Sequence, residues 1–206
     1  MLKGRKVLVL AADLFEDMEL LYPVYRLQEE EVDVTIAGLT ADKVTGKKGH
    51  GPIEVDTTVD DVDGSAFDAL VIPGGFAPDK LRQSQAVLSL VDSFNAAGKP
   101  IAFICHAGWV PISAGIVKGK RGTSVGAIKD DLVNAGLLWE DSPVVVDGNL
   151  ISSRTPADLP QFCRALIAAL QSGVKGRESG ATETSSRPGA TRRGGIVSAD
   201  PSLRSG

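Results

Sequence analysis

Cys105 and His106 are the residues of this sequence best suited to covalent chemistry. Cys105 directly follows the apolar run IAFI, and the small residues Ala107 and Gly108 precede a helical pattern. A cysteine in such a strand-to-helix turn lies at a helix N-terminus, where partial positive charge favours the thiolate. The pattern indicates a nucleophilic thiol, and we expect its pKa to lie below the unperturbed value of about 8.5.

The turn around Cys105 is similar in layout to the nucleophile elbow of α/β hydrolases. It departs from that pattern at Phe103, where the hydrolase motif has glycine. The alternative is a buried structural cysteine at a strand end, because free cysteine packs as a small apolar side chain. Cys163 lies midway along an apolar helix face, and we expect it to react slowly.

The general base for Cys105 must come from a short list, because the chain has only two histidines. His106 is adjacent to the thiol, although neighbouring side chains usually point apart. His50 lies in a Gly-rich turn, where a solvated loop histidine is the ordinary interpretation. Two cysteines and two histidines make a four-ligand zinc site implausible, so we expect no metal, and nothing indicates a cofactor.

Glu16 is the carboxylate that we expect beside Cys105. It comes just after the first apolar strand and opens the following helix. Two like charges cannot share such a site at low cost, so the carboxyl group would keep its proton and donate it to the thiolate. The alternative is an ordinary first-turn glutamate that the helix dipole favours. Asp13 and Asp17 flank Glu16 and are further candidates to orient His106.

Short apolar runs alternate with helical patterns along the chain. We expect buried strands at 6–12, 32–39, 67–75 and 100–108, hairpins at 44–59 and 144–153, and helices at 16–31, 78–97 and 156–170. This alternation predicts an α/β fold with a doubly wound, mostly parallel sheet sandwiched between helices. Ligands of such sheets bind beyond the carboxyl ends of the strands. The loops that carry Glu16, Gly74–Gly75 and Cys105 should therefore converge on one cleft.

Composition narrows the class of protein. The 206 residues are 43% hydrophobic, which suffices for one core, and the net charge of −4 gives no basic excess for a nucleic-acid partner. No apolar stretch approaches the ~20 residues that span a bilayer. The apolar run at 7–12 has no signal-peptide cleavage site after it, so we expect no membrane association. Two isolated cysteines favour reduced thiols and a cytoplasmic location.

The composition changes near Gln171. Residues 171–206 are rich in Gly, Ser, Thr and Arg and show no apolar periodicity. Such a segment cannot bury enough surface to offset its ordering entropy. We therefore expect a single domain at 1–170 and a disordered, dispensable tail at 171–206.

Several motifs in order make the chain similar to the PfpI-type intracellular proteases of the ThiJ/PfpI superfamily. The matching stretches are FEDMELLYP (15–23), FDALVIPGG (67–75), GKPIAFICHAG (98–108), SAGIVKGKRGTS (113–124), IKDDLVNAG (128–136) and VVVDGNLISSRTPADLP (144–160). The resemblance covers residues 5–170. One departure is Ala107–Gly108–Trp109, where the family often has Gly-Pro after Cys-His. We expect the two tryptophans, Trp109 and Trp139, to be packing residues.

The resemblance implies a flavodoxin-like sandwich and a homo-oligomer, a dimer or a larger assembly such as a hexamer. It implies that Cys105 is the nucleophile, Glu16 the carboxyl beside it and His106 the catalytic histidine. Gly75 and His106 correspond to the family's oxyanion donors. The carboxylate that a neighbouring subunit supplies to the Cys–His–acid triad corresponds to Asp79, where close relatives carry glutamate.

Three functions follow from this resemblance and from the thiol. The first is a cysteine-dependent hydrolase, a peptidase or a deglycase, that attacks a peptide or a reactive-dicarbonyl (glycated) substrate in stress protection. The second is a glyoxalase that acts on methylglyoxal. The third is a non-catalytic redox-sensing or chaperone protein that uses the same cysteine, and a plain partner-binding domain remains the simplest alternative.

Overall fold

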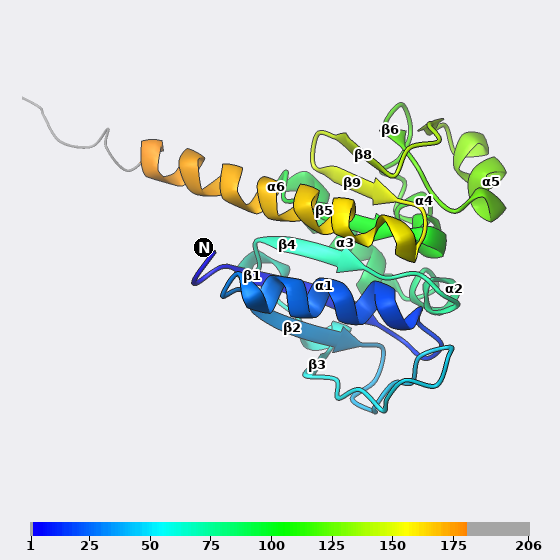
Figure 1. Cartoon of the computed structure of the whole chain (residues 1–206), viewed down its shortest axis with the longest axis horizontal. Helices are drawn as coiled ribbons and strands as arrows, with labels where there is room; N and C mark the ends of the chain where they lie inside the picture. The colour runs from blue at the N-terminus through cyan, green and yellow to red at the C-terminus, as the bar shows by residue number, and fades with distance from the viewer. Residues whose placement is uncertain (1, 181–206) are drawn as a thin grey trace, which may run out of the picture.

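A seven-stranded sheet forms the centre of this computed structural model, which describes residues 2–180 (Figure 1). The strands in spatial order are β3 (Thr57–Thr58), β2 (Asp33–Gly38), β1 (Lys6–Ala11), β4 (Ala69–Ile72), β5 (Ile101–Ile104), β9 (Leu150–Ser153) and β8 (Val144–Asp147). All neighbouring pairs are parallel except β8 and β9. The predicted mostly parallel sheet is confirmed, as is the hairpin at 144–153.

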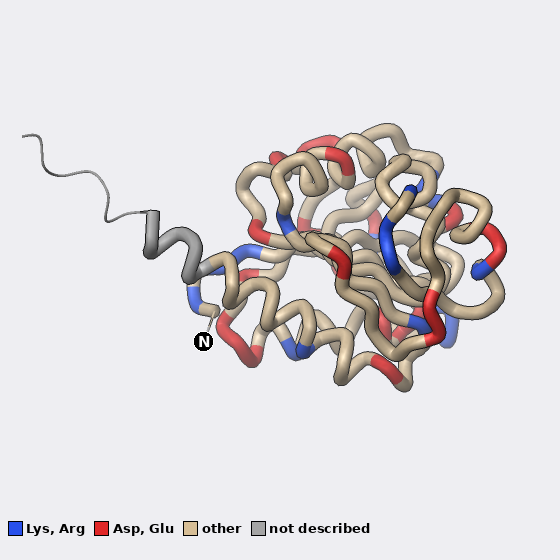
Figure 2. Tube along the Cα trace, turned by 90° about the horizontal axis from the view of Figure 1, so that it is seen from above, with Lys and Arg blue, Asp and Glu red and all other residues tan. Residues whose placement is uncertain are grey.

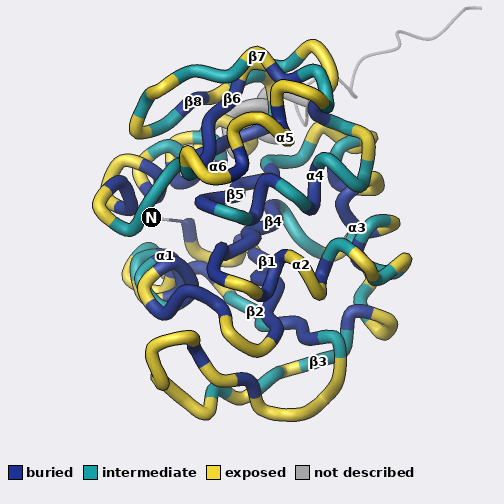
Figure 3. Tube along the Cα trace, turned by 90° about the vertical axis from the view of Figure 1, so that its right-hand side faces the viewer, coloured by how far each residue is buried: buried dark blue, intermediate teal, exposed yellow. Residues whose placement is uncertain are grey.

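The α-helices of residues 2–180 are α1 (Asp17–Glu29), α2 (Ala77–Leu81), α3 (Gln85–Ala96), α4 (Trp109–Ser113), α5 (Lys129–Asn134) and α6 (Leu159–Gly180). Helices cover both faces of the sheet. Helices α1 and α6 pack side by side on one face, whereas α3 packs against β4 and β5 on the other (Figures 1 and 3). This is the sandwich that the alternation of strands and helices predicts, and it agrees with the flavodoxin-like fold that the family resemblance implies.

The core lies where the three central strands meet the helices. Every residue of β4 and β5 is fully or almost fully buried, and so is β1 from Val7 onward. Strands buried on both faces need continuous apolar runs rather than alternating ones, and LVLA, ALVI and IAFI are such runs. The central strands are therefore a rigid base for the loops at their carboxyl ends.

A smaller lobe lies beside the sheet. The short parallel strands β6 (Arg121–Gly122) and β7 (Leu138–Trp139) pair with each other. Between them in sequence, α5 contributes to a separate apolar cluster of Val117, Ile128, Leu132 and Leu137. Trp109 packs against this cluster, so the lobe borders the segment that follows Cys105.

Helix α6 runs from Leu159 to Gly180 and so continues past the boundary that we expected at residue 170. The rest of the predicted tail, 181–206, lies outside the described residues. No helix within residues 2–180 is long and apolar enough to cross a membrane. Lys and Arg are interspersed with Asp and Glu along the trace (Figure 2).

Candidate active site

Three loops meet at the carboxyl ends of β1, β4 and β5, which are adjacent in the sheet. Figure 3 looks onto this edge of the molecule. The loop after β1 pairs with the loop after β4 through a bridge between Phe15 and Gly75. Cys105 follows β5 directly and begins a 3-10 turn, Cys105–Gly108. The predicted convergence of these loops is confirmed.

Cys105 has a strained backbone conformation. Its φ angle is +62°, a left-handed value that L-residues other than glycine rarely adopt. The residue is 6% exposed, and the backbone N–H groups of His106 and Gly75 point at its sulfur. A strained turn that holds a thiol among N–H donors is the arrangement of a nucleophile elbow with an oxyanion hole.

The two glycines of the β4 loop are required by close packing. A Cβ on Gly74 would collide with Glu19 Oε2 and would lie 2.7 Å from Cys105 Cβ. Gly75 has φ +83°, and a Cβ there would collide with the backbone of the β1 loop. The Gly-Gly pair therefore lets the loop after β4 approach the thiol closely enough for the N–H of Gly75 to interact with the sulfur.

Glu19, rather than Glu16, is the carboxyl group beside the thiol. Its side chain is fully buried and interacts with Cys105, and its Oε2 accepts the N–H of Gly74 at 2.9 Å. Burial, and then the charge of Glu16, raise the pKa of Glu19 to about 7. Oε1 of Glu19 has no hydrogen-bond partner among the described residues. The acid is therefore poised to hold or release a proton near neutral pH.

The placement of Glu16 beside Cys105 was wrong, and its ordinary alternative is what the structure shows. Glu16 is the N-cap of α1, and its Oε2 accepts the N–H groups of Met18 and Glu19. Its other oxygen, Oε1, pairs with Lys48 Nζ at 2.7 Å. Residues three apart lie on the same side of a helix, so Glu19 lies one turn further along and reaches the thiol. That spacing, in a helix whose acidic first turn faces a buried sheet edge, was the signal that could have identified Glu19.

The thiol of Cys105 is not acidic in this arrangement. Burial first, and then the charge of Glu19, raise the pKa of the thiol to about 12. The N–H groups of His106 and Gly75 lower this pKa, but by less. The prediction of a low pKa for Cys105 was wrong because it rested on the helix start alone and left out the buried carboxyl group. When Glu19 is protonated, its charge no longer opposes the thiolate and its O–H is able to donate to the sulfur.

His106 does reach the sulfur of its neighbour. Its Nδ1 lies 3.3 Å from Cys105 Sγ, and its ring meets the Trp109 ring edge-to-face at 5.3 Å. Burial, and then the charge of Lys47, lower the pKa of His106, which keeps the imidazole neutral and able to accept a proton. Within the described part of the chain, no carboxylate hydrogen-bonds to this ring.

The other candidate residues lie apart from the thiol. Asp13 accepts the N–H of Thr45, and Asp17 accepts the N–H groups of Lys48 and His50. Both acids therefore hold the 45–50 loop and do not orient His106.

His50 and Asp79 are exposed, and neither contacts the thiol within its own chain. Asp79 lies in the first turn of α2, at the rim of the site.

The 45–50 loop brings a cation near the thiol. The N–H of Lys47 donates to the carbonyl of Phe15, the residue that bridges to Gly75. The charge of Lys47 acts on Cys105, Glu19 and His106 alike. The charge of Lys47 therefore offsets part of the effect of Glu19 on an anion at the sulfur.

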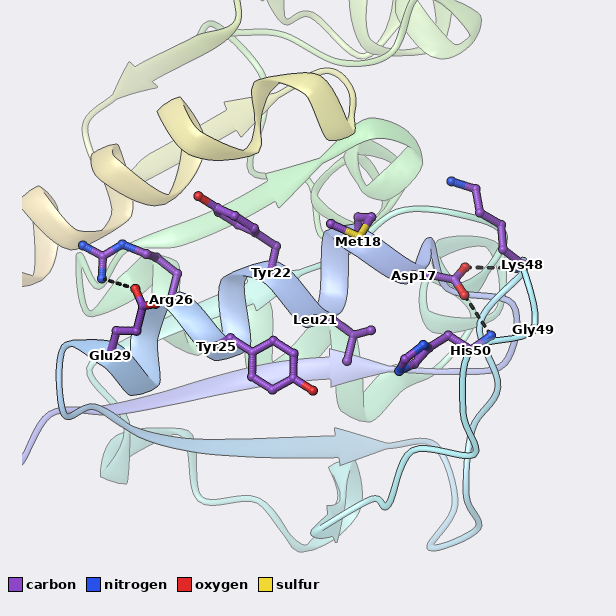
Figure 4. Close-up of a pocket in the computed structure, with 10 residues that line it drawn as sticks. All are labelled: Asp17, Met18, Leu21, Tyr22, Tyr25, Arg26, Glu29, Lys48, Gly49 and His50. Atoms are coloured by element: carbon purple, nitrogen blue, oxygen red, sulfur yellow. Dashed lines mark hydrogen bonds and ion pairs between the residues drawn. The ribbon is translucent and has the colours of Figure 1, made fainter.

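A cavity of about 820 Å³ lies away from the thiol. It runs along the outer face of α1, between that helix and the 48–50 loop (Figure 4). Figure 4 shows Met18, Leu21 and Tyr25 along this face, with His50 at one end. Met18 and Tyr25 are 47% and 58% exposed, which is high for apolar side chains.

Comparison with known proteins relates the whole domain to one family. Residues 5–169 match the DJ-1/PfpI family. The chain is 46% identical to "Deglycase PfpI" of Pyrococcus furiosus over 166 residues, which cover 81% of this chain and 99% of that protein. It is 42% identical to "Putative cysteine protease YraA" of Bacillus subtilis over 169 residues, 82% of this chain and 99% of that one. The structure of Drosophila melanogaster DJ-1beta superposes with a TM-score of 0.75 at 32% identity, covering 84% and 97% of the two chains.

Proposed function

Because this chain belongs to the DJ-1/PfpI family, we propose that it is a cysteine-dependent hydrolase whose nucleophile is Cys105. The observation that carries this proposal is the strained elbow at Cys105, with two N–H groups aimed at the sulfur and His106 Nδ1 at 3.3 Å. A thiol, a neutral base and two oxyanion donors in contact are the minimum that acyl transfer through a thioester requires.

The reaction begins with proton transfer from Cys105 Sγ to His106. The thiolate then attacks a carbonyl carbon, a C–S bond forms, and the electron pair of the C=O bond moves to oxygen. The N–H groups of Gly75 and His106 stabilise that oxyanion. For a peptide substrate, collapse of the oxyanion breaks the C–N bond at the attacked carbon, and the imidazolium gives its proton to the departing amine. Water hydrolyses the thioester in the second half, with His106 again as the base.

We propose that the substrate is a glycated, dicarbonyl-derived amine or a peptide, and that the activity serves stress protection. The names of the relatives, deglycase and putative cysteine protease, support this range. Both cysteines are free, which suits a reducing intracellular compartment.

We also propose that the working form is a homo-oligomer. His106 lacks a carboxylate partner within its own described chain, and the first turn of α2 presents the exposed Asp79 at the rim. The exposed apolar side chains Met18 and Tyr25 on α1 support burial against a second subunit.

The test compares wild type with Cys105→Ala on a methylglyoxal-modified amine and a fluorogenic peptide, side by side. Wild type should release the amine or the fluorophore, and Cys105→Ala should lose at least about 1000-fold in kcat. Cys163→Ala is the matched control and should keep wild-type turnover. Conversion of free methylglyoxal to lactate without release of amine would favour the glyoxalase alternative.

A redox-sensing role is a second candidate, favoured by one observation. The buried Glu19, with its pKa raised to about 7, is able to donate a hydrogen bond to an oxidised sulfur at Cys105. Peroxide-dependent formation of a sulfinate at Cys105, in a protein that turns over neither substrate, would select this role.

A further inference from the structure

An open cleft of about 390 Å³ lies beside the thiol site, between the end of α2 and helices α4 and α5. Six residues line it: Arg82, Trp109, Ile112, Asp131, Asn134 and Ala135. None of them takes part in the attack at Cys105. The cleft and the thiol site nevertheless share Trp109, because the ring that lines the cleft also contacts His106 at 5.3 Å.

The Trp109 ring lies between the two sites, and its contacts hold it in place. Its indole N–H donates to Asp131 Oδ2 at 2.8 Å. It also packs against the apolar cluster of the small lobe. The expectation that Trp109 only fills space is therefore incomplete, because the ring has a catalytic histidine against it and an open cleft beside it.

Arg82 presents unused donors to this cleft. Its Nε donates to Ser113 Oγ at 2.9 Å, and its guanidinium carbon lies 5.7 Å from the centre of the Trp109 ring. These contacts fix the plane of the guanidinium. In the part of the chain that the structure describes, the two terminal nitrogens make no hydrogen bond or ion pair.

A planar guanidinium with both terminal nitrogens unused matches a carboxylate, which accepts two parallel N–H···O bonds. Asp131 is the carboxylate that lines the cleft, and its Oδ2 is already bound to the indole. Ile112 and Ala135 offer apolar contact for the carbon chain of a ligand. Arg82 is therefore the group in the cleft that is free to bind an anion.

We propose that this cleft is a substrate subsite that binds a carboxylate on the molecule whose carbonyl is attacked at Cys105. The proposal rests on the proposed function and narrows its substrate class to amino-acid or peptide derivatives, as opposed to small neutral carbonyls. The carboxylate comes either from the C-terminus of a short peptide or from an acidic side chain, and the two sources have the same chemistry.

The kinetic test uses four substrates with the same scissile group: one with a free C-terminus, its amide, and the amide with either glutamate or glutamine next to the terminus. Wild type should prefer a carboxylate-bearing substrate by about 10- to 100-fold in kcat/KM. The preferred pair identifies the source of the carboxylate. In Arg82→Gln the preference should fall to near unity, whereas Lys80→Gln, which removes an exposed charge of α2 outside the cleft, should keep it.

A binding test separates this proposal from the proposed function, because it needs no turnover. In Cys105→Ala with Trp139→Phe, Trp109 is the only tryptophan, so its fluorescence reports on the cleft. An acetylated alanine tripeptide with a free carboxylate should change this fluorescence and its amide should not, and Arg82→Gln should abolish the change.

Fluorescence that responds equally to the acid and the amide, or a response that survives Arg82→Gln, would overturn the subsite. So would a loss of oligomeric state in Arg82→Gln on size exclusion, because Arg82 would then be an interface residue. Arg82-dependent binding in a protein without hydrolytic activity would support the subsite and count against the proposed function.

Discussion

Cys105 and Glu19 share a buried space in which both cannot be ionised at low cost. Burial raises the pKa of both groups; the charge of Glu16 raises that of Glu19 further, and the charge of Glu19 raises that of Cys105 further. The pair therefore tends to keep one proton near neutral pH, and the thiolate forms most easily when that proton resides on Glu19. Glu16 is the N-cap of α1, one helical turn away, and its charge raises the pKa of Glu19.

Glu19→Gln should make the thiol more reactive in alkaline buffer. Above pH 7 the wild-type carboxylate is charged and opposes the thiolate, whereas glutamine is neutral. We expect alkylation of Cys105 at pH 8 to be about 10-fold faster, which corresponds to about one pKa unit. The measurement is iodoacetamide labelling against pH in a Cys163→Ala background.

Glu16→Gln is the matched control for this experiment, because it removes the same charge from the cap position. Its alkylation profile should stay close to that of wild type. A larger change in Glu16→Gln than in Glu19→Gln would restore Glu16 as the residue that tunes the thiol.

The raised pKa of Glu19 also predicts how stability changes with pH. The folded protein binds this proton more tightly than the unfolded chain, whose reference pKa is 4.5. The stabilisation is therefore fully present below pH 4.5 and is lost as the pH rises through about 7. The full linkage is on the order of 3 kcal/mol. Urea denaturation from pH 5 to pH 8 should show this decline in wild type and a flatter profile in Glu19→Gln. Parallel profiles for the two proteins would contradict it.

At the scale of elements, the first turn of α1 divides three tasks among three acids. Glu16 caps the helix, Asp17 holds the 45–50 loop, and Glu19 contacts the thiol. Desolvation raises the pKa of Asp17, but hydrogen bonds from the N–H groups of Lys48 and His50 outweigh it, so the net shift is downward. The loop that carries Lys47 is therefore bound to the first turn of α1, which also carries Glu19.

Asp17→Ala should release this loop without unfolding the sheet. Loss of two hydrogen bonds to a carboxylate should cost about 1–3 kcal/mol. The amides of Lys48 and His50 should then exchange with solvent faster.

The pKa of Asp17 is lower in the folded protein than its reference value of 3.8. The contribution of Asp17 to stability is therefore fully present above pH 3.8 and is lost as the pH falls through the pKa of the folded protein. Hydrogen exchange by mass spectrometry checks the loop, and Asp13→Ala, which removes one bond to Thr45, is the milder control. Unchanged exchange at 45–50 would show that other contacts hold the loop.

The sequence predicted the elements better than it predicted the contacts between them. Buried strands and the Gly-Gly turn leave local patterns, so the sheet and the convergence on Cys105 could be foreseen. The choice of Glu19 over Glu16 depends on which side of α1 faces the sheet edge, and only packing settles that. The short strands β6 and β7 have no periodicity long enough to detect. Helix α6 continues to Gly180 through residues whose composition suggested a tail.

At the scale of the whole molecule, the proposed site in one chain has a thiol, an imidazole and the N–H groups of the turn, but no carboxylate within residues 2–180 hydrogen-bonds to His106. An imidazolium that forms during attack is stabilised by a nearby carboxylate, which also fixes the tautomer of the neutral ring. Asp13 and Asp17 are committed to the 45–50 loop, and Glu19 is committed to Cys105. Asp79 of a second chain is the candidate that remains from the resemblance.

If Asp79 reaches His106 across an interface, two inactive chains should complement each other. Cys105→Ala lacks the nucleophile but offers an intact Asp79, and Asp79→Ala has the reverse defect. After subunit exchange, an equal mixture should regain about a quarter of wild-type activity if chains pair at random, because half of the sites have Cys105 and half of those have Asp79 from the neighbour. Activity should also fall on dilution as subunits separate. Asp79→Glu, which keeps the carboxylate and lengthens the side chain by one methylene, should remain active and is the positive control. Mixtures as inactive as their parents despite exchange confirmed by native mass spectrometry would exclude a shared site, as would full activity in a verified monomer.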